Sequence, residues 1–171
     1  RGDILDQRGT TLATSVPFRT VCADPSLIFT QHVAVARTLA PRLKMDVAEV
    51  LEKLMPVVRT NAVGDTVTNQ FVLLKRHVPL AVWEDVREAM ATLDLGMNPS
   101  KKSALGYAVS ALKTRAIYAQ EGYLRRYPEG ILAAHVLGFT TSGEVNTGMG
   151  TTFADHGETG IEAVFEEALS G

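Results

Sequence analysis

The chain has 171 residues, the size of one domain with a single core, and its 17 basic and 19 acidic side chains give a net charge of −2. That balance leaves no positive surplus to neutralise a phosphate backbone, so the sequence predicts no nucleic-acid partner. The longest apolar run, residues 131–139, is far shorter than the roughly 20 residues that span a bilayer. Because the chain opens on arginine and not on methionine, we interpret it as part of a longer protein.

Cysteine and histidine usage argues against a disulfide or a metal site. Cys22 is the only cysteine, so no internal disulfide can form. Metal-binding histidines usually lie close in sequence, for example four residues apart on one helix, and the four histidines of this chain are scattered. We therefore expect no metal and no cofactor.

In chain order, the hydrophobic pattern predicts short strands interleaved with amphipathic helices. We predict a hairpin over residues 4–13, a strand over 15–23, helices over 33–43 and 46–55, a strand over 71–74, helices over 80–93 and 104–112, two short strands over 116–126, and helices over 131–137 and 161–169. We predict loops over 60–70 and 96–103, and a flexible surface segment over 140–159.

Proline, glycine and capping residues set several of these boundaries. Pro41 is expected to kink or end its helix. Asp46 followed by Glu49 predicts a capping box, and Gly138 suits the left-handed position after a short helix. Helices and strands do not alternate regularly, and the strands have the length of antiparallel ribbons. The sequence therefore favours an α+β fold over a doubly wound parallel sheet.

Three separated segments carry motifs that occur together in one protein family. The first is Arg1-Gly2 followed by a turn from Asp6 to Gly9. The motif residues of the other two are Arg126, Tyr127, Pro128, Gly130, His135 and Gly138 in the second segment, and Gly160, Glu162 and Gly171 in the third. In this order the segments resemble the N-terminal dimerisation domain of class B penicillin-binding proteins. The resemblance is closer to the division (septal, FtsI-like) branch than to the elongation branch.

The first segment departs from the family pattern at two positions. Gln7 stands where the family usually has arginine, and Arg8 stands where it has asparagine. Since asparagine tolerates positive φ and caps turns locally, this difference leaves the turn type open. Asp24-Pro25 and residues 74–76 add agreement with the division branch. Residues 94–114 are longer than the family norm, and we interpret them as an insertion.

The resemblance implies an elongated, non-catalytic pedestal of class α+β that spans residues 1–171. Its base would comprise residues 1–30 and 115–171, and a peripheral lobe would comprise about residues 31–114. The function implied is that of the N-terminal domain of a peptidoglycan D,D-transpeptidase of cell-wall synthesis and division. Implied partners are its own C-terminal transpeptidase domain, a membrane glycosyltransferase, other division proteins and a second copy in a homodimer. The implied location is the periplasmic side of the cell membrane, with an N-terminal anchoring helix outside this chain.

A physical hypothesis follows from the spread of the three motifs along the chain. If the family retains them together, they should converge in space, and Glu162 near a helix N-terminus would then gain an arginine neighbour. Arg1 and Arg126 are the candidates for that arginine. The alternative is a solvated Glu162 on the exposed side of its helix.

Two other functions compete with the pedestal. Ser110 and Lys113 match the Ser-x-x-Lys element of serine acyl hydrolases, although Lys113-Thr114 is followed by arginine and not by the glycine of that class. With the numbers of serine and lysine present, one such match is close to chance. The third hypothesis is an unrelated α+β interaction module, in which the three segments would lie apart.

Overall fold

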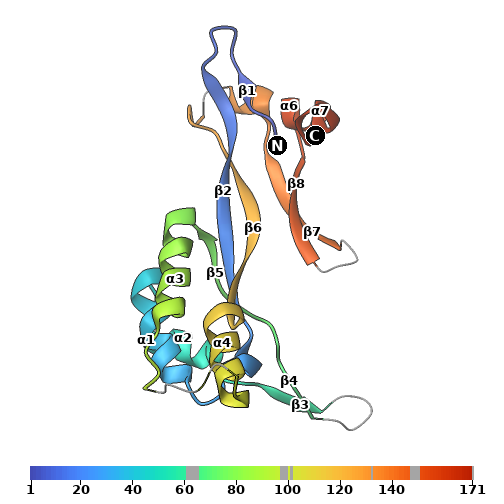
Figure 1. The fold of residues 1–171 in the computed structure, drawn as a ribbon. Coiled ribbons are helices and arrows are strands. Elements are labelled where there is room, and N and C mark those ends of the chain that lie inside the picture. Colours follow the sequence, from blue (N-terminus) through green and yellow to red (C-terminus); the bar gives the residue numbers. More distant parts are fainter. Residues whose placement is uncertain (61–65, 97–99, 101, 132, 147–150, 171) are drawn as a thin grey trace. The chain divides into compact units, whose positions relative to one another are not determined.

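A computed structural model describes the chain except for residues 61–65, 97–99, 101, 132, 147–150 and 171 (Figure 1). By its contacts the chain forms two compact units. Unit 1 comprises Arg1–Phe18 and Glu121–Gly171, and unit 2 comprises Arg19–Gln120. The strand pairs with a defined register are all antiparallel, and helices are mixed with them, which confirms the α+β class.

Unit 1 begins with the predicted hairpin. Strand β1 (Ile4–Leu5) pairs with the first part of strand β2 (Thr11–Ala23), with Ile4 opposite Ala13. In the turn, one carboxylate oxygen of Asp6 accepts from the backbone N–H groups of residues 8 and 10, and Gly9 has a φ of 83°. The Asp6 side chain therefore supplies the local cap that the missing asparagine would have given.

Strand β6 (Ile117–Arg126) pairs with β2 and is continuous, so the prediction of two short strands over 116–126 is wrong. The sequence signal for a break was Gly122. In the structure this glycine accommodates a ring, because a Cβ atom there would lie 2.6 Å from Cζ of Phe18. Glycine inside a strand can mark such a close approach as well as a turn.

The remainder of unit 1 contains short helices and one long hairpin. Its elements are α5 (Ala134–Leu137), β7 (Thr140–Asn146), β8 (Thr151–Gly157), α6 (Gly160–Val164) and α7 (Glu166–Ser170). Strands β7 and β8 pair antiparallel from Thr140 opposite Gly157 to Asn146 opposite Thr151, so the predicted flexible segment over 140–159 is wrong. Threonine favours strands, but the segment lacks the apolar alternation that reveals a half-buried strand.

The C-terminal helix predicted over 161–169 is also wrong in its continuity. The helix breaks at Phe165, whose φ of −104° and ψ of 27° lie outside the helical region. Helical spacing from Ile161 would put Val164 and Phe165 on one apolar face, yet these side chains are 78% and 54% exposed. Only Ile161 and Leu169 from that face pack against the small core of unit 1, whose buried members are Ile4, Ala13 and Leu137.

Two glycines let the end of α5 contact the start of α6 through the backbone. Gly138 has a φ of 76°, and a Cβ atom there would lie 1.8 Å from the carbonyl oxygen of Thr159. Gly160 has a φ of 62°, and its Cβ would lie 2.5 Å from the carbonyl oxygen of Val136. The positive φ expected at Gly138 is confirmed, but its ψ of −156° is extended and not left-handed helical.

Unit 2 contains most of the helices. In chain order its elements are η1 (Pro25–Leu27), α1 (His32–Leu43), α2 (Val47–Leu54), β3 (Val58–Thr60), β4 (Thr66–Thr68), β5 (Val72–Val78), α3 (Leu80–Thr92) and α4 (Ala104–Arg115). The helices predicted over 33–43, 46–55, 80–93 and 104–112 are confirmed, as is the strand predicted over 71–74. Strand β4 contradicts part of the loop predicted over 60–70, and residues 61–65 and 97–99 of the predicted loops lie outside the described residues.

Local boundaries in unit 2 follow the expected chemistry with two exceptions. Pro41 lies in the last turn of α1 without ending it, and the helix ends at Lys44, which has a φ of 51°. Asp46 caps α2 by accepting from the N–H of Ala48 at 2.7 Å. Glu49 does not complete a capping box, because its carboxylate accepts from Lys53 at 2.8 Å.

The core of unit 2 is entirely apolar and lies where helices cover the antiparallel pair β2 and β5 (Figure 1). Its fully buried large side chains include Ile28, Leu39, Leu43, Leu54, Met90 and Leu112. The N–H of Asp24 donates to the carbonyl oxygen of Ala116 at 2.8 Å, which joins the end of β2 to the end of α4.

The backbone contact of Gly138 gives a stability prediction, for which Gly9 is the reference. Gly9→Ala should lower the free energy of unfolding by roughly 1–2 kcal/mol, because it forces a side chain to positive φ in open space. Gly138→Ala adds a backbone clash to the same strain and should cost about 1–3 kcal/mol more. The check is urea unfolding of both variants. Equal losses would show that Thr159 yields without cost.

Candidate functional site

The candidate site is built around a buried carboxylate in unit 1. Glu162 lies in the first turn of α6 and has no exposed surface. A charged carboxylate without water is strongly destabilised unless cations and hydrogen-bond donors replace its hydration. The partners of Glu162 therefore identify which segments must meet at this point.

Two arginines from distant parts of the chain hold Glu162. The Nε atom of Arg1 donates to Oε2 at 2.8 Å, and the Nε atom of Arg125 donates to Oε1 at 2.7 Å. The arginine side chains are 5% and 2% exposed, so both ion pairs are shielded from water. The hydroxyl of Tyr127 lies 3.4 Å from Oε1. Burial and the nearby Glu162 carboxylate raise the pKa of Tyr127.

Glu166, on α7, forms a second carboxylate partner for Arg1. The two terminal nitrogens of Arg1 donate to the two Glu166 oxygens at 2.9 and 2.8 Å, a bidentate pair. Nη2 of Arg1 also donates to the carbonyl oxygen of Glu162 at 2.7 Å. These hydrogen bonds, together with one from the Gly157 N–H at 2.7 Å, lower the pKa of Glu166 to about 2. The Glu166 bonds also raise the pKa of the Arg1 guanidinium.

Arg125 links the ion pairs to the two N-terminal strands. Its Nη1 atom donates to the carbonyl oxygen of Gly2 at 2.7 Å and to Oγ of Ser15 at 3.1 Å. We call Arg1, Arg125, Tyr127, Glu162 and Glu166 the Glu162 cluster. It contains two cations and two anions, so its formal charge is zero, and it joins the first residues, β2, β6, α6 and α7.

The predicted convergence of the three motif segments is confirmed. The pairing of Glu162 with Arg1 is confirmed, and the solvated alternative is wrong. The pairing with Arg126 is wrong, because Arg126 is exposed and its neighbour Arg125 occupies the site. Successive residues of a strand face opposite sides, so Arg125 lies on the side of Tyr127, and that alternation was the signal to choose Arg125.

The other predicted motif residues lie around the cluster and outside it. Gly2 donates its N–H to the carbonyl oxygen of Leu169 at 2.7 Å, which places the first residues beside α7. Asp6 and Gly9 form the hairpin turn, and Gly138 and Gly160 form the backbone contact described above. Three others, Pro128, Gly130 and His135, are exposed and stand apart from Glu162, and Gly171 lies outside the described residues.

The Ser-x-x-Lys match does not form part of this site. Ser110 and Lys113 lie on α4 in unit 2, where the Ser110 side chain is exposed. Among the residues described, no group of three or more histidine, cysteine or acidic side chains could hold a metal ion. Nor does any helix within the described ranges have the length and apolar character needed to cross a membrane.

A family model for the penicillin-binding protein dimerisation domain matches residues 1–171. The chain belongs to this family. A curated relative, the peptidoglycan D,D-transpeptidase FtsI of Buchnera aphidicola, is 23% identical over 172 residues, covering 100% of this chain and 23% of the relative. Dimerisation domains of this family are non-catalytic.

Solved structures share the fold across the whole chain. Penicillin-binding protein 2X of Streptococcus thermophilus gives a TM-score of 0.65 at 19% identity over 100% of this chain and 23% of that one. A peptidoglycan synthetase of Bifidobacterium adolescentis gives 0.52 at 24% identity, and penicillin-binding protein 2 of Helicobacter pylori, solved in complex with MreC, gives 0.53 at 19%. Each of these two matches covers 100% of this chain and 28% of the chain of the solved structure. The chain thus spans about a quarter of the relatives it matches.

Adjacent arginines of β6 provide a matched test of the cluster. Arg125→Gln should lower the free energy of unfolding by about 3–5 kcal/mol, because it leaves part of a buried carboxylate charge uncompensated. Arg126→Gln changes an exposed side chain and should stay within about 0.5 kcal/mol. Urea unfolding of the two variants measures the difference. Comparable losses would show that Glu162 does not depend on Arg125.

The lowered pKa of Glu166 predicts a pH dependence. Its carboxylate is stabilised in the folded state, so this contribution to stability is fully present above the ordinary pKa of 4.5 and is lost as the pH falls towards the folded-state pKa of about 2. The stability gap between the parent chain and Glu166→Gln should therefore shrink between pH 4.5 and 2. Thermal unfolding across that range measures the gap, with Glu167→Gln as the exposed control on the same helix. A gap that stays constant would contradict the assignment.

Proposed function

We propose that this chain is the non-catalytic N-terminal pedestal of a peptidoglycan D,D-transpeptidase that acts in cell-wall synthesis and division. The observation that carries the proposal is the Glu162 cluster. It fixes the first residues of the chain to the last two helices through buried ion pairs and the backbone bond between Gly2 and Leu169. A support needs this property, because a loose junction would transmit neither position nor orientation to a following domain.

Unit 1 is proposed as the base of the pedestal and unit 2 as its peripheral lobe. The exposed apolar side chains of unit 1 support this assignment. Val136 and Phe139, at α5, are 61% and 52% exposed, and Val164 and Phe165, at α6, are 78% and 54% exposed. The backbone contact between Gly138 and Thr159 keeps these two groups on neighbouring elements. We propose that the transpeptidase domain packs on this apolar surface, because such patches mark interaction sites.

The partners and the location follow from the same proposal. Penicillin-binding protein 2 of Helicobacter pylori, which shares this fold, has been solved in complex with MreC, and this supports a role in protein contacts. For this chain we propose contacts with a membrane glycosyltransferase and other division proteins, and homodimer formation. We place the domain on the periplasmic side of the membrane, held by an anchoring helix that precedes it. The division branch is proposed over the elongation branch because the motifs resemble it and because a curated relative is FtsI.

The test uses the full-length protein with Val164→Asp and Phe165→Asp combined. Charges on the proposed contact surface should uncouple the transpeptidase domain from unit 1, so one thermal transition should become two, and protease cleavage between the domains should increase. Labelling by fluorescent penicillin should persist, because the acylation site lies in the other domain. Val33→Asp, an exposed apolar residue of α1 in unit 2, is the control. Unchanged transitions and cleavage would reject this contact surface, and labelling of residues 1–171 alone would favour the Ser110–Lys113 hypothesis.

A further inference from the structure

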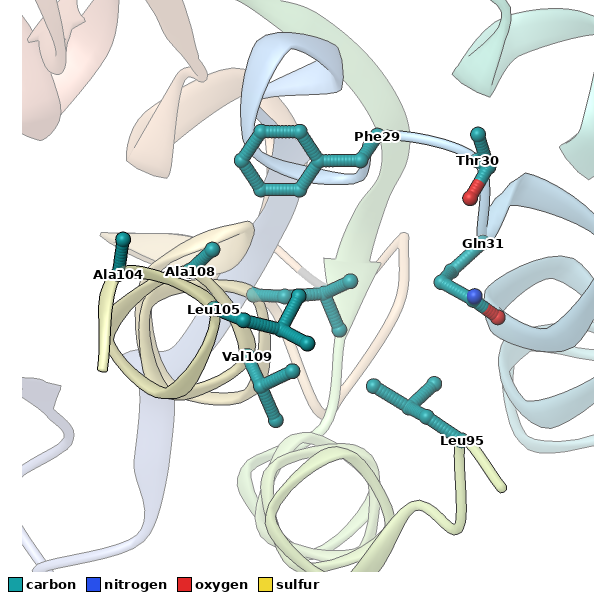
Figure 2. A pocket seen from close by; sticks show the side chains of 9 residues that line it. Phe29, Thr30, Gln31, Leu95, Ala104, Leu105, Ala108 and Val109 are labelled. Carbon is teal, nitrogen blue, oxygen red and sulfur yellow. The ribbon is translucent and has the colours of Figure 1, made fainter. Parts of the chain in front are cut away.

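Unit 2 carries an apolar pocket that the pedestal function has not used. It has a volume of about 390 Å³ and lies between the segment that leads into α1 and the first half of α4 (Figure 2). Its apolar lining is contributed by Phe29, Leu95, Leu105, Ala108, Val109 and Leu112. A pocket of this size falls within the range that holds small ligands or a few side chains of a bound segment.

Two large apolar side chains stand exposed at this pocket. Phe29 is 53% exposed, Leu105 is 52% exposed, and Figure 2 shows both side chains beside the space they line. Phe29 also has a φ of 54°, a left-handed conformation that is strained for a residue other than glycine. The fold thus holds an aromatic ring at the surface in a strained backbone conformation.

The segments that line the pocket carry few acidic residues. Residues 25–37 and 95–109, which hold most of the lining, contain no aspartate or glutamate and three lysines and arginines, and the exposed Asp94 adjoins the lining residue Leu95. Unit 2 as a whole has 13 basic and 9 acidic residues, whereas unit 1 has 4 basic and 10 acidic residues. Lys102, two residues before the first lining residue of α4, is exposed. The charge around the pocket is therefore complementary to an acidic partner.

The ends of two helices add to this charge. Both α1 and α4 begin at the pocket, next to Gln31 and at Ala104, and each helix has 12 residues. Neither helix has an acidic residue in its first turn. The partial positive charge of a helix N-terminus favours a nearby anion, and here no side chain of the first turn neutralises it.

We propose that this pocket binds an amphipathic segment of another envelope protein, in which bulky apolar side chains are flanked by aspartate or glutamate. The proposal rests on the pedestal function and specifies the chemistry of one of its partners. Apolar side chains would fill the pocket beside Phe29 and Leu105, and the acidic flank would face Lys102 and the two helix N-termini. A second copy is a weaker occupant. Its unit 2 carries the same surplus of basic side chains, and its unit 1 on this pocket would make a head-to-tail contact, which gives a ring or a filament and not a twofold dimer.

The experiment places a photocrosslinking amino acid at Leu105 of the full-length protein in cells, with Glu88 on α3 as the control position. The expected product is a covalent adduct at Leu105, absent at Glu88, with a segment of another protein that carries apolar residues next to acidic ones. No adduct, an adduct with a second copy or with lipid, or a captured segment without acidic residues would overturn the proposal.

Variants separate the two parts of the recognition. Lys102→Glu should reduce the Leu105 adduct at least tenfold, whereas Lys44→Glu, an exposed lysine after the opposite end of α1, should leave it within twofold. Phe29→Gly removes the ring and relieves the strain, so the adduct should fall at least fivefold while the thermal stability of unit 2 is kept or raised. Loss of stability would show that Phe29 is only structural. If the adduct fails while the domain coupling of unit 1 behaves as predicted, the pocket proposal alone is rejected.

Discussion

The burial of the Glu162 carboxylate is the constraint on which the rest of unit 1 depends. With no exposed surface, its charge must be balanced by groups that are covalently distant, since α6 offers no cation of its own. Arg1 and Arg125 meet this need only if the first residue, β6 and α6 come together. The remaining donors of Arg1 bind Glu166, so the cluster is neutral and most of its donors are used.

Such a cluster contributes more to specificity than to net stability. Removing water from the charged groups of Arg1, Arg125 and Glu162 offsets much of their attraction, and apolar replacements of similar shape often fold as well. What an apolar contact cannot do is define a single register, because it is non-directional. Paired hydrogen bonds from Arg1 and Arg125 require each segment at one position, and the backbone contact of Gly138 with Thr159 fixes the neighbouring turn in the same way. This precision is what a domain that orients another requires.

The sequence predicted the elements whose side chains alternate between core and water. It missed features that depend on contacts with residues elsewhere in the chain. The helices of unit 2 were found because their apolar faces repeat at helical spacing. The β7–β8 hairpin was missed because threonines and glycines give no such pattern. Gly122 indicated a break between two strands, and the sequence alone does not show that the ring of Phe18 lies against it. The break at Phe165 was missed because local propensity there still favours a helix.

The candidate site was predicted by its segments but not by all of its atoms. Family motifs indicated that the three segments meet, and Arg1 with Glu162 followed from charge. Arg126 was predicted because it belongs to the family motif. Side chains of neighbouring strand residues point to opposite faces, so a shift of one residue, from Arg126 to Arg125, changes the face. Glu166 was missed because its partner comes from the opposite end of the chain. Long-range ion pairs leave no periodic trace in a single sequence.

The two units solve opposite problems with the same chain. Unit 1 encloses opposite charges in fixed pairs, which suits a surface that must hold one orientation. Unit 2 has an apolar core, carries more basic than acidic side chains and has an apolar pocket at its surface. Long-range charge speeds encounter and an apolar pocket then retains the partner, so this arrangement suits reversible recognition. The residues of the Glu162 cluster and those that line the pocket are different residues in different units, so a substitution in one set leaves the other set unchanged.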